Sequence, residues 1–147
     1  MSLQDELNQS MKEAMKAKDS LRLNCIRGVR TAVKNKEIEQ RGPLDDAGVL
    51  AVIGTLLKQR RESADIYRQN DREELAAKEE AEAKVLQEFL PEQLGDAELE
   101  AIVTEAVAES GATGPKDMGA VMKLVLPRVA GRADGKKVNE LVRSKLS

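Results

Sequence analysis

Apolar residues recur every three or four positions along almost the whole chain, the spacing that places them on one side of an α-helix. The pattern begins with "LQDELNQSMKEAM" at residues 3–15 and returns after each break in the sequence. Tyr67 and Phe89 are the only aromatic residues. Because β-sheets favour aromatic and β-branched residues, this chain is better suited to helices packed on helices. We therefore predict an all-α fold.

The segment "LPEQLGD" at residues 90–96 combines a proline, a glycine and an aspartate between two helical regions. Such residues mark loops rather than helices. We predict an N-terminal domain of long helices over residues 1–91, a linker over 92–95, and a small helical domain over 96–147. Three further signals concern single helices: Asp71 should cap the fourth helix, Pro127 should end the penultimate one, and Asp134 should cap the last.

Charge is unevenly distributed along the chain, although the net charge is only -2. Residues 1–61 carry +4, residues 62–110 carry -11, and residues 111–147 carry +5. A basic end on an acidic protein suggests an acidic partner. Taken alone, however, the pattern is explained more simply by charged helix faces in water.

Two C-terminal motifs carry a resemblance to a known family. They are "GATGPKDMGAVMKLVLP" and "GRADGKKVNELVRSKL", preceded in the N-terminal half by "AMKAKDSLRLNCIR", "KQRRES" and "AAKEEAEAKVLQEFLPEQL". The chain resembles the YqeY family throughout its length, and its C-terminal part is similar to the tail of the GatB subunit of tRNA-dependent amidotransferases. The resemblance implies a long-helix N-terminal domain, a compact C-terminal helical domain of the GatB/YqeY type, and a link to tRNA or translation.

The last helix offers a candidate binding surface. If Val138 and Val142 face the interior, Lys136 and Arg143 project from the opposite side with Asn139 between them. An equally good interpretation of the same geometry pairs Lys136 with Glu140 on an ordinary surface, and only the resemblance favours RNA. The predicted RNA-binding residues are Lys116, Lys123, Arg132, Lys136, Asn139 and Arg143.

Composition also indicates how RNA would be held. Recognition of unstacked bases relies on aromatic platforms, and neither Tyr67 nor Phe89 lies near the basic end. Contacts to phosphates and to the shape of a folded RNA remain. Together with the family resemblance, which implies the link to tRNA, this predicts a non-catalytic accessory protein of tRNA binding or tRNA metabolism that binds no DNA. Two alternatives stay open: a protein-interaction module of the translation machinery, and an accessory factor in carbon–nitrogen ligation with glutamine as amido donor.

The chain lacks the residues that an enzyme of a familiar class would need. It has no histidine, no "GxxxxGKS" phosphate loop and no "GxSxG" elbow. Its one cysteine, Cys25, falls on the apolar side of the second helix, where packing is a better explanation than nucleophilic catalysis. We predict no catalytic residue, no cofactor and no metal site.

The same residues suggest a cellular location. A single cysteine forms no internal disulfide, and the N-terminal sequence "MSLQDELNQS" carries acids where a signal peptide requires an apolar run. The longest apolar stretches are too short to cross a bilayer. We expect a cytoplasmic protein without membrane segments.

Two further features have alternative interpretations. A second basic row consists of Arg27, Arg30 and Lys34, and "KQRR" at residues 58–61 adds further cations. We expect these cations to pair with Glu79, Glu80 and Glu82 on the fourth helix rather than to bind a partner. Gly119 lies inside a short helix, where glycine costs about 1 kcal/mol relative to alanine. We expect it to allow close contact with a neighbouring helix; the alternative is contact with a nucleic-acid backbone.

Overall fold

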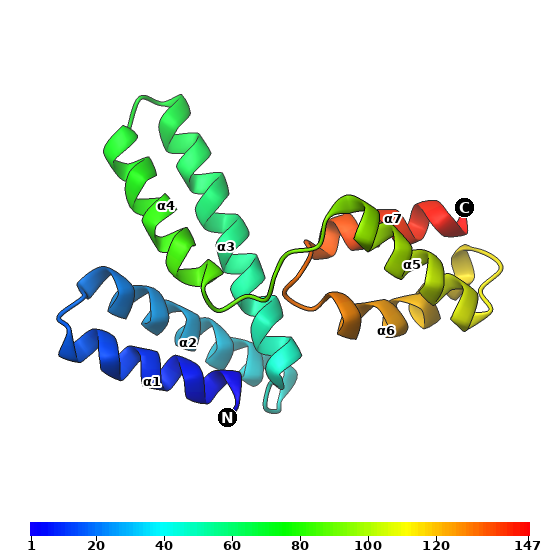
Figure 1. Cartoon of the computed structure of the whole chain (residues 1–147), viewed down its shortest axis with the longest axis horizontal. Helices are drawn as coiled ribbons and strands as arrows, with labels where there is room; N and C mark the ends of the chain where they lie inside the picture. Colours follow the sequence, from blue (N-terminus) through cyan, green and yellow to red (C-terminus); the bar gives the residue numbers. More distant parts are fainter. The chain divides into compact units, whose positions relative to one another are not determined.

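The computed structural model describes residues 1–147 and consists of seven α-helices and one 3-10 turn, with no β-strand (Figure 1). The all-α prediction is therefore confirmed. No helix combines the length and apolar character that crossing a bilayer requires. The chain divides into two compact units, Met1–Leu90 and Pro91–Ser147.

The N-terminal unit contains four helices: α1 (Leu3–Lys16), α2 (Ser20–Gln40), α3 (Asp46–Gln69) and α4 (Glu73–Gln87). Three of them start where a side chain caps the first turn, because Ser2, Asp19 and Asp45 each accept a hydrogen bond from a backbone N–H three residues later. Helix α1 packs on α2 and α3 on α4, while α2 also contacts α3 and α4. The shared core includes the wholly buried Ile26 and Ile53.

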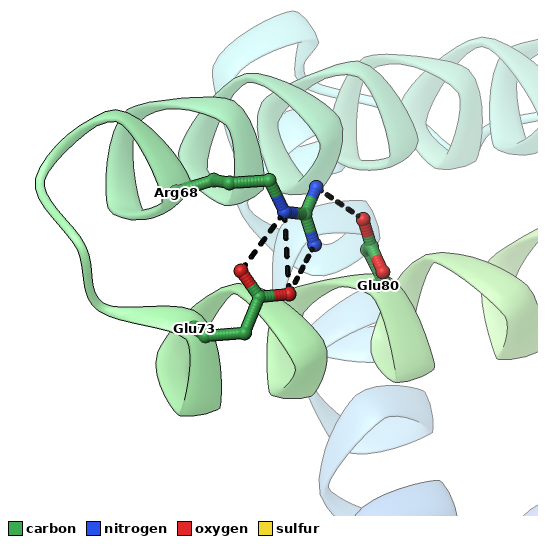
Figure 2. Close-up of polar contacts among 3 residues, drawn as sticks. All are labelled: Arg68, Glu73 and Glu80. Atoms are coloured by element: carbon green, nitrogen blue, oxygen red, sulfur yellow. Dashed lines mark hydrogen bonds and ion pairs between the residues drawn. The ribbon is translucent and has the colours of Figure 1, made fainter.

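Helices α3 and α4 form a long antiparallel pair held by small apolar contacts and by ion pairs (Figure 1). Ala64 and Ala76 are buried, so the two backbones approach closely near the turn. Arg68 on α3 binds both Glu73 (3.1 Å) and Glu80 (2.7 Å) on α4 (Figure 2). These hydrogen bonds raise the pKa of Arg68 and lower the pKa of Glu80.

The prediction that Asp71 caps α4 is wrong. The helix starts at Glu73 with Arg72 as its N-cap residue and no side-chain cap. Asp71 instead takes a left-handed conformation (φ 57°) in the turn, and the N–H of Arg72 closes α3 by bonding the carbonyl of Tyr67 at 2.8 Å. Aspartate adopts the left-handed conformation more readily than most residues, so Asp71 favours the turn between α3 and α4 and does not cap α4.

The C-terminal unit contains α5 (Asp96–Ser110), a 3-10 turn η1 (Pro115–Asp117), α6 (Met118–Val129) and α7 (Gly135–Leu146). The three α-helices contact one another around a core of valines, leucines and alanine. Gly111 ends α5 in a left-handed conformation (φ 70°). The prediction that Pro127 ends α6 is wrong, because the helix continues to Val129. Only two residues of α6 follow Pro127. The N–H that proline lacks therefore removes one hydrogen bond from the last turn and does not interrupt a long helix.

Residues 92–95, which we expected to form a linker, lie in the C-terminal unit. The N–H of Leu94 donates to the carbonyl of Arg132 at 2.8 Å, and the Gln93 side chain donates to the carbonyl of Gly131 at 2.7 Å. Leu94 also packs against the C-terminal core. This segment therefore supports the loop that leads into α7.

Candidate nucleic-acid interface

Helix α7 presents the row of polar residues that the sequence suggested. Val138 and Val142 are wholly buried, whereas Lys136, Asn139 and Arg143 are exposed on the opposite side. The row covers seven residue steps, about 10 Å along the helix. Its two cations can thus contact different phosphate groups.

Lys116 and Lys123 lie on the segment before α7 in the sequence. Lys116 belongs to η1, which contacts both α6 and α7. Lys123 is exposed on α6, opposite the wholly buried Val121 and Val125. Both lysines therefore extend outward from the same helical unit as the α7 row.

Gly119 lies between these two lysines, three residues after Lys116 and four before Lys123. A Cβ atom added at Gly119 would meet no atom within 4 Å. The expectation that this glycine allows a neighbouring helix to approach is therefore wrong. The exposed position leaves room for an external partner over α6.

Arg132 is half-buried and has a structural contact. Its Nε donates to the carbonyl oxygen of Glu92 at 3.1 Å, which fixes the guanidinium beside the loop leading into α7. A guanidinium has five N–H donors in a rigid fork, so this bond orients the group and uses only one of its donors.

The start of α7 is already capped by a carboxylate. Asp134 accepts a hydrogen bond from the backbone N–H of Lys136 at 3.2 Å, as the sequence predicted. A phosphate cannot use the same N–H while this bond exists, and the carboxylate charge opposes an anion. Binding of an anion here therefore depends on the Lys136 side chain rather than on the helix terminus.

Most of the remaining basic side chains of this unit are paired with acids of α5. Arg128 binds Glu109 at 2.6 Å, Lys145 binds Glu100 at 2.9 Å, and Lys137 binds Asp96. Residues 91–147 hold eight basic and nine acidic residues, so the unit has a net charge of -1. Five cations of the unit form no ion pair: Arg132, which donates to a backbone carbonyl, and the exposed Lys116, Lys123, Lys136 and Arg143.

The expected ion pairs with the acids of α4 are formed by α3 but not by the second basic row. Arg60 of α3 pairs with Glu79 at 3.1 Å and Glu82 at 3.5 Å, which raises its pKa. Glu80 pairs with Arg68. The predicted pairing is therefore confirmed for Arg60 of the "KQRR" segment. It is wrong for Arg27, Arg30 and Lys34, which instead line a groove between α1 and α2. Their spacing signalled a common face, but only the packing shows which element that face meets.

Cys25 is partly buried, and its Sγ lies 3.6 Å from the carbonyl oxygen of Glu82, close enough to donate a weak hydrogen bond. Burial, with the nearby Glu82 carboxylate, raises the pKa of the thiol to about 11. The thiol is consequently protonated near neutral pH, which opposes nucleophilic reactivity.

Together these features define an all-helical protein with an outward basic surface on its C-terminal unit. The chain matches the family described as Yqey-like protein over residues 4–146 and belongs to the YqeY family.

Curated relatives carry the name altered inheritance of mitochondria protein 41, mitochondrial. The protein from Vanderwaltozyma polyspora is 32% identical over 120 residues, covering 76% of this chain and 64% of the relative. That from Lachancea thermotolerans is 33% identical over 112 residues, covering 74% and 60%. That from Pyrenophora tritici-repentis is 30% identical over 146 residues, covering 95% and 80%. The matches thus span less than two thirds of the first two relatives.

The names of these relatives contradict the expected cytoplasmic location, because all three are mitochondrial proteins. The reasoning behind that expectation relied on a lone cysteine and an acidic N-terminal sequence. Those features argue against an oxidising, secretory environment. They do not distinguish one reducing compartment from another, so the prediction went further than its evidence.

Proposed function

We propose that this protein is a non-catalytic accessory factor that binds folded tRNA through its C-terminal unit. The observation that carries the proposal is the contrast between two groups of basic side chains. Arg128, Lys137 and Lys145 are neutralised by α5, whereas a second group extends into solvent. The second group consists of Lys116, Lys123, Lys136 and Arg143.

The mode of binding follows from the types of side chain at the surface of the C-terminal unit. Lysine and arginine contact phosphates, Asn139 can bond phosphate or ribose oxygens, and Arg132 is held in place by its bond to Glu92. No aromatic residue belongs to this unit, so base stacking contributes nothing. Recognition would therefore depend on the shape and backbone of the RNA, as a folded tRNA provides.

Salt dependence gives a quantitative test. If four or five cations each neutralise a phosphate, the logarithm of affinity should fall with the logarithm of salt concentration with a slope of about -3 to -4.5. Filter binding of purified tRNA to the full chain at several salt concentrations measures this slope. A slope near zero would contradict phosphate contact.

Charge reversal locates the surface. We expect the double variant Lys136→Glu and Arg143→Glu to bind tRNA much more weakly, because both residues are exposed and face away from the core. The matched control is Lys12→Glu with Lys16→Glu, two exposed positions on α1 that change the net charge equally. Circular dichroism should show that both variants remain folded.

Equal binding by the wild type and the α7 variant, or no binding of tRNA at low salt, would refute the RNA proposal. A protein-interaction module of the translation machinery would then be the better explanation. An accessory role in carbon–nitrogen ligation is a narrower form of the same proposal, and it requires that tRNA binding be found first.

A further inference from the structure

A groove of about 520 Å³ lies between α1 and α2 in the N-terminal unit. This volume is within the range of small-molecule sites. The residues that line it come from one side of each helix: Gln4, Leu7, Asn8, Arg27, Arg30, Thr31, Val33, Lys34 and Glu37. Nothing in the proposed RNA-binding surface uses this groove, which belongs to the other unit.

The groove is electropositive. Arg27, Arg30 and Lys34 are exposed cations without an ion pair, and they follow one another along α2 at spacings of three and four residues. The row is about 10 Å long, and Arg30 Nη1 lies 3.1 Å from Met11 Sδ on α1. The one carboxylate in the lining, Glu37, accepts a hydrogen bond from the N–H of Leu44 at 2.9 Å. The lining thus carries two more positive than negative charges.

The neutral part of the lining is polar at the sides and apolar at the floor. Gln4, Asn8 and Thr31 provide amide and hydroxyl groups, and the Gln4 Nε2 is held by the carbonyl of Leu44 at 3.3 Å. Leu7 and Val33 contribute only a little surface, since they are 1% and 4% exposed. A ligand here would meet cations, hydrogen-bonding groups and a narrow apolar floor.

These properties distinguish among possible occupants. An amphipathic helix of a partner protein needs an extended apolar groove, and this floor offers almost none. On α1 the lining extends only from Gln4 to Asn8, about 6 Å, which is short for a polymer. Consecutive phosphates on a small molecule fit a row of cations about 10 Å long, because arginine and lysine are the usual partners of phosphate groups.

We propose that the α1–α2 groove is a binding site for a small phosphorylated ligand of the nucleoside di- or triphosphate class. Arg27, Arg30 and Lys34 bind its phosphates. Asn8 and Thr31 hydrogen-bond its polar remainder.

Isothermal titration calorimetry of the full chain with ATP, ADP, AMP and inorganic tripolyphosphate tests the proposal. Affinity should rise from AMP to ATP, because more phosphates then meet the row. The double variant Arg27→Gln and Arg30→Gln should weaken ATP binding at least about tenfold, since each loses a charge-assisted contact. The control Lys12→Gln with Lys16→Gln removes two exposed cations of α1 outside the groove and should bind ATP as the wild type does.

A titration with a short RNA oligonucleotide completes the set of probes. Three results would overturn the proposal: no heat with any small-molecule probe, an equal loss of ATP affinity in both double variants, or binding of the RNA oligonucleotide alone. The last would make the groove part of an RNA surface instead. The outcome is independent of the proposed RNA binding, because the Lys136→Glu and Arg143→Glu variant leaves the groove intact. That variant should lose tRNA and retain ATP, whereas the Arg27→Gln and Arg30→Gln variant should lose ATP.

Discussion

Replacement of Gly119 by alanine should stabilise the C-terminal unit. Gly119 is exposed in α6, its φ is not positive, and an added Cβ would contact nothing within 4 Å. The substitution therefore introduces no clash and removes the entropic cost of glycine in a helix.

The expected gain follows from helix propensity. Glycine in a helix interior is about 0.8–1 kcal/mol less favourable than alanine, and Gly119 lies in the first turn of α6, where less is gained. We expect about 0.5–0.8 kcal/mol, which for a small unit corresponds to a rise in Tm of about 2–6 °C. Thermal unfolding of the full chain followed by circular dichroism measures it, with the two transitions fitted separately if they do not coincide.

The same variant gives a second readout on RNA. Gly119 lies between Lys116 and Lys123, so a phosphate backbone bound to both would pass over it. We expect Gly119→Ala to weaken tRNA binding severalfold although the protein is more stable. Gly54→Ala in α3, where an added Cβ also meets nothing within 4 Å, should stabilise the other unit without changing tRNA affinity. A fall in the Tm for Gly119→Ala would refute the reasoning about its surroundings.

Two further predictions concern titratable groups. Burial raises the pKa of Cys25 to about 11. Alkylation of this thiol by iodoacetamide at pH 8 should therefore be much slower than alkylation of glutathione, and it should accelerate as the pH approaches 11. Rapid alkylation at pH 8 would contradict a buried thiol. The contribution of this group to stability is present below about pH 9 and declines as pH rises towards 11, because the unfolded thiol loses its proton first. Asp134→Ala should cost the C-terminal unit about 1 kcal/mol in urea unfolding, whereas Asp134→Asn keeps a cap and should cost little. Asp134→Asn should also bind tRNA more tightly, since it removes a carboxylate beside Lys136, and unchanged affinity would argue against phosphate contact at that end of α7.

The helical fold and much of the core were predictable because they depend on local spacing. Residues such as Ile53 and Val142 recur on one side of their helices, and burying that side is favourable whatever neighbour it meets. The caps at Asp19 and Asp134 were predictable for a similar reason, since a capping side chain acts on a backbone N–H only two or three residues away.

Errors arose where two local signals competed. Asp71 is suitable both for a cap and for a left-handed turn, and the sequence does not say where α3 ends. The apolar spacing of α4 predicts that Leu75 is buried, but its side chain is 40% exposed, because the smaller Ala76 and Ala83 make the buried contacts. Close approach of α3 and α4 favours small side chains, and that distance is a tertiary property.

The sequence by itself determined which residues share a helix face, including both basic rows. Only the tertiary structure decided which cations form an ion pair. Arg60 pairs with Glu79 and Glu82, whereas Arg30 lines a groove. The reason is physical. The period of a helix is set by its own backbone, so it can be derived from neighbouring residues. An ion pair between two helices requires their charged atoms to lie within about 4 Å, and that separation depends on how the whole core packs.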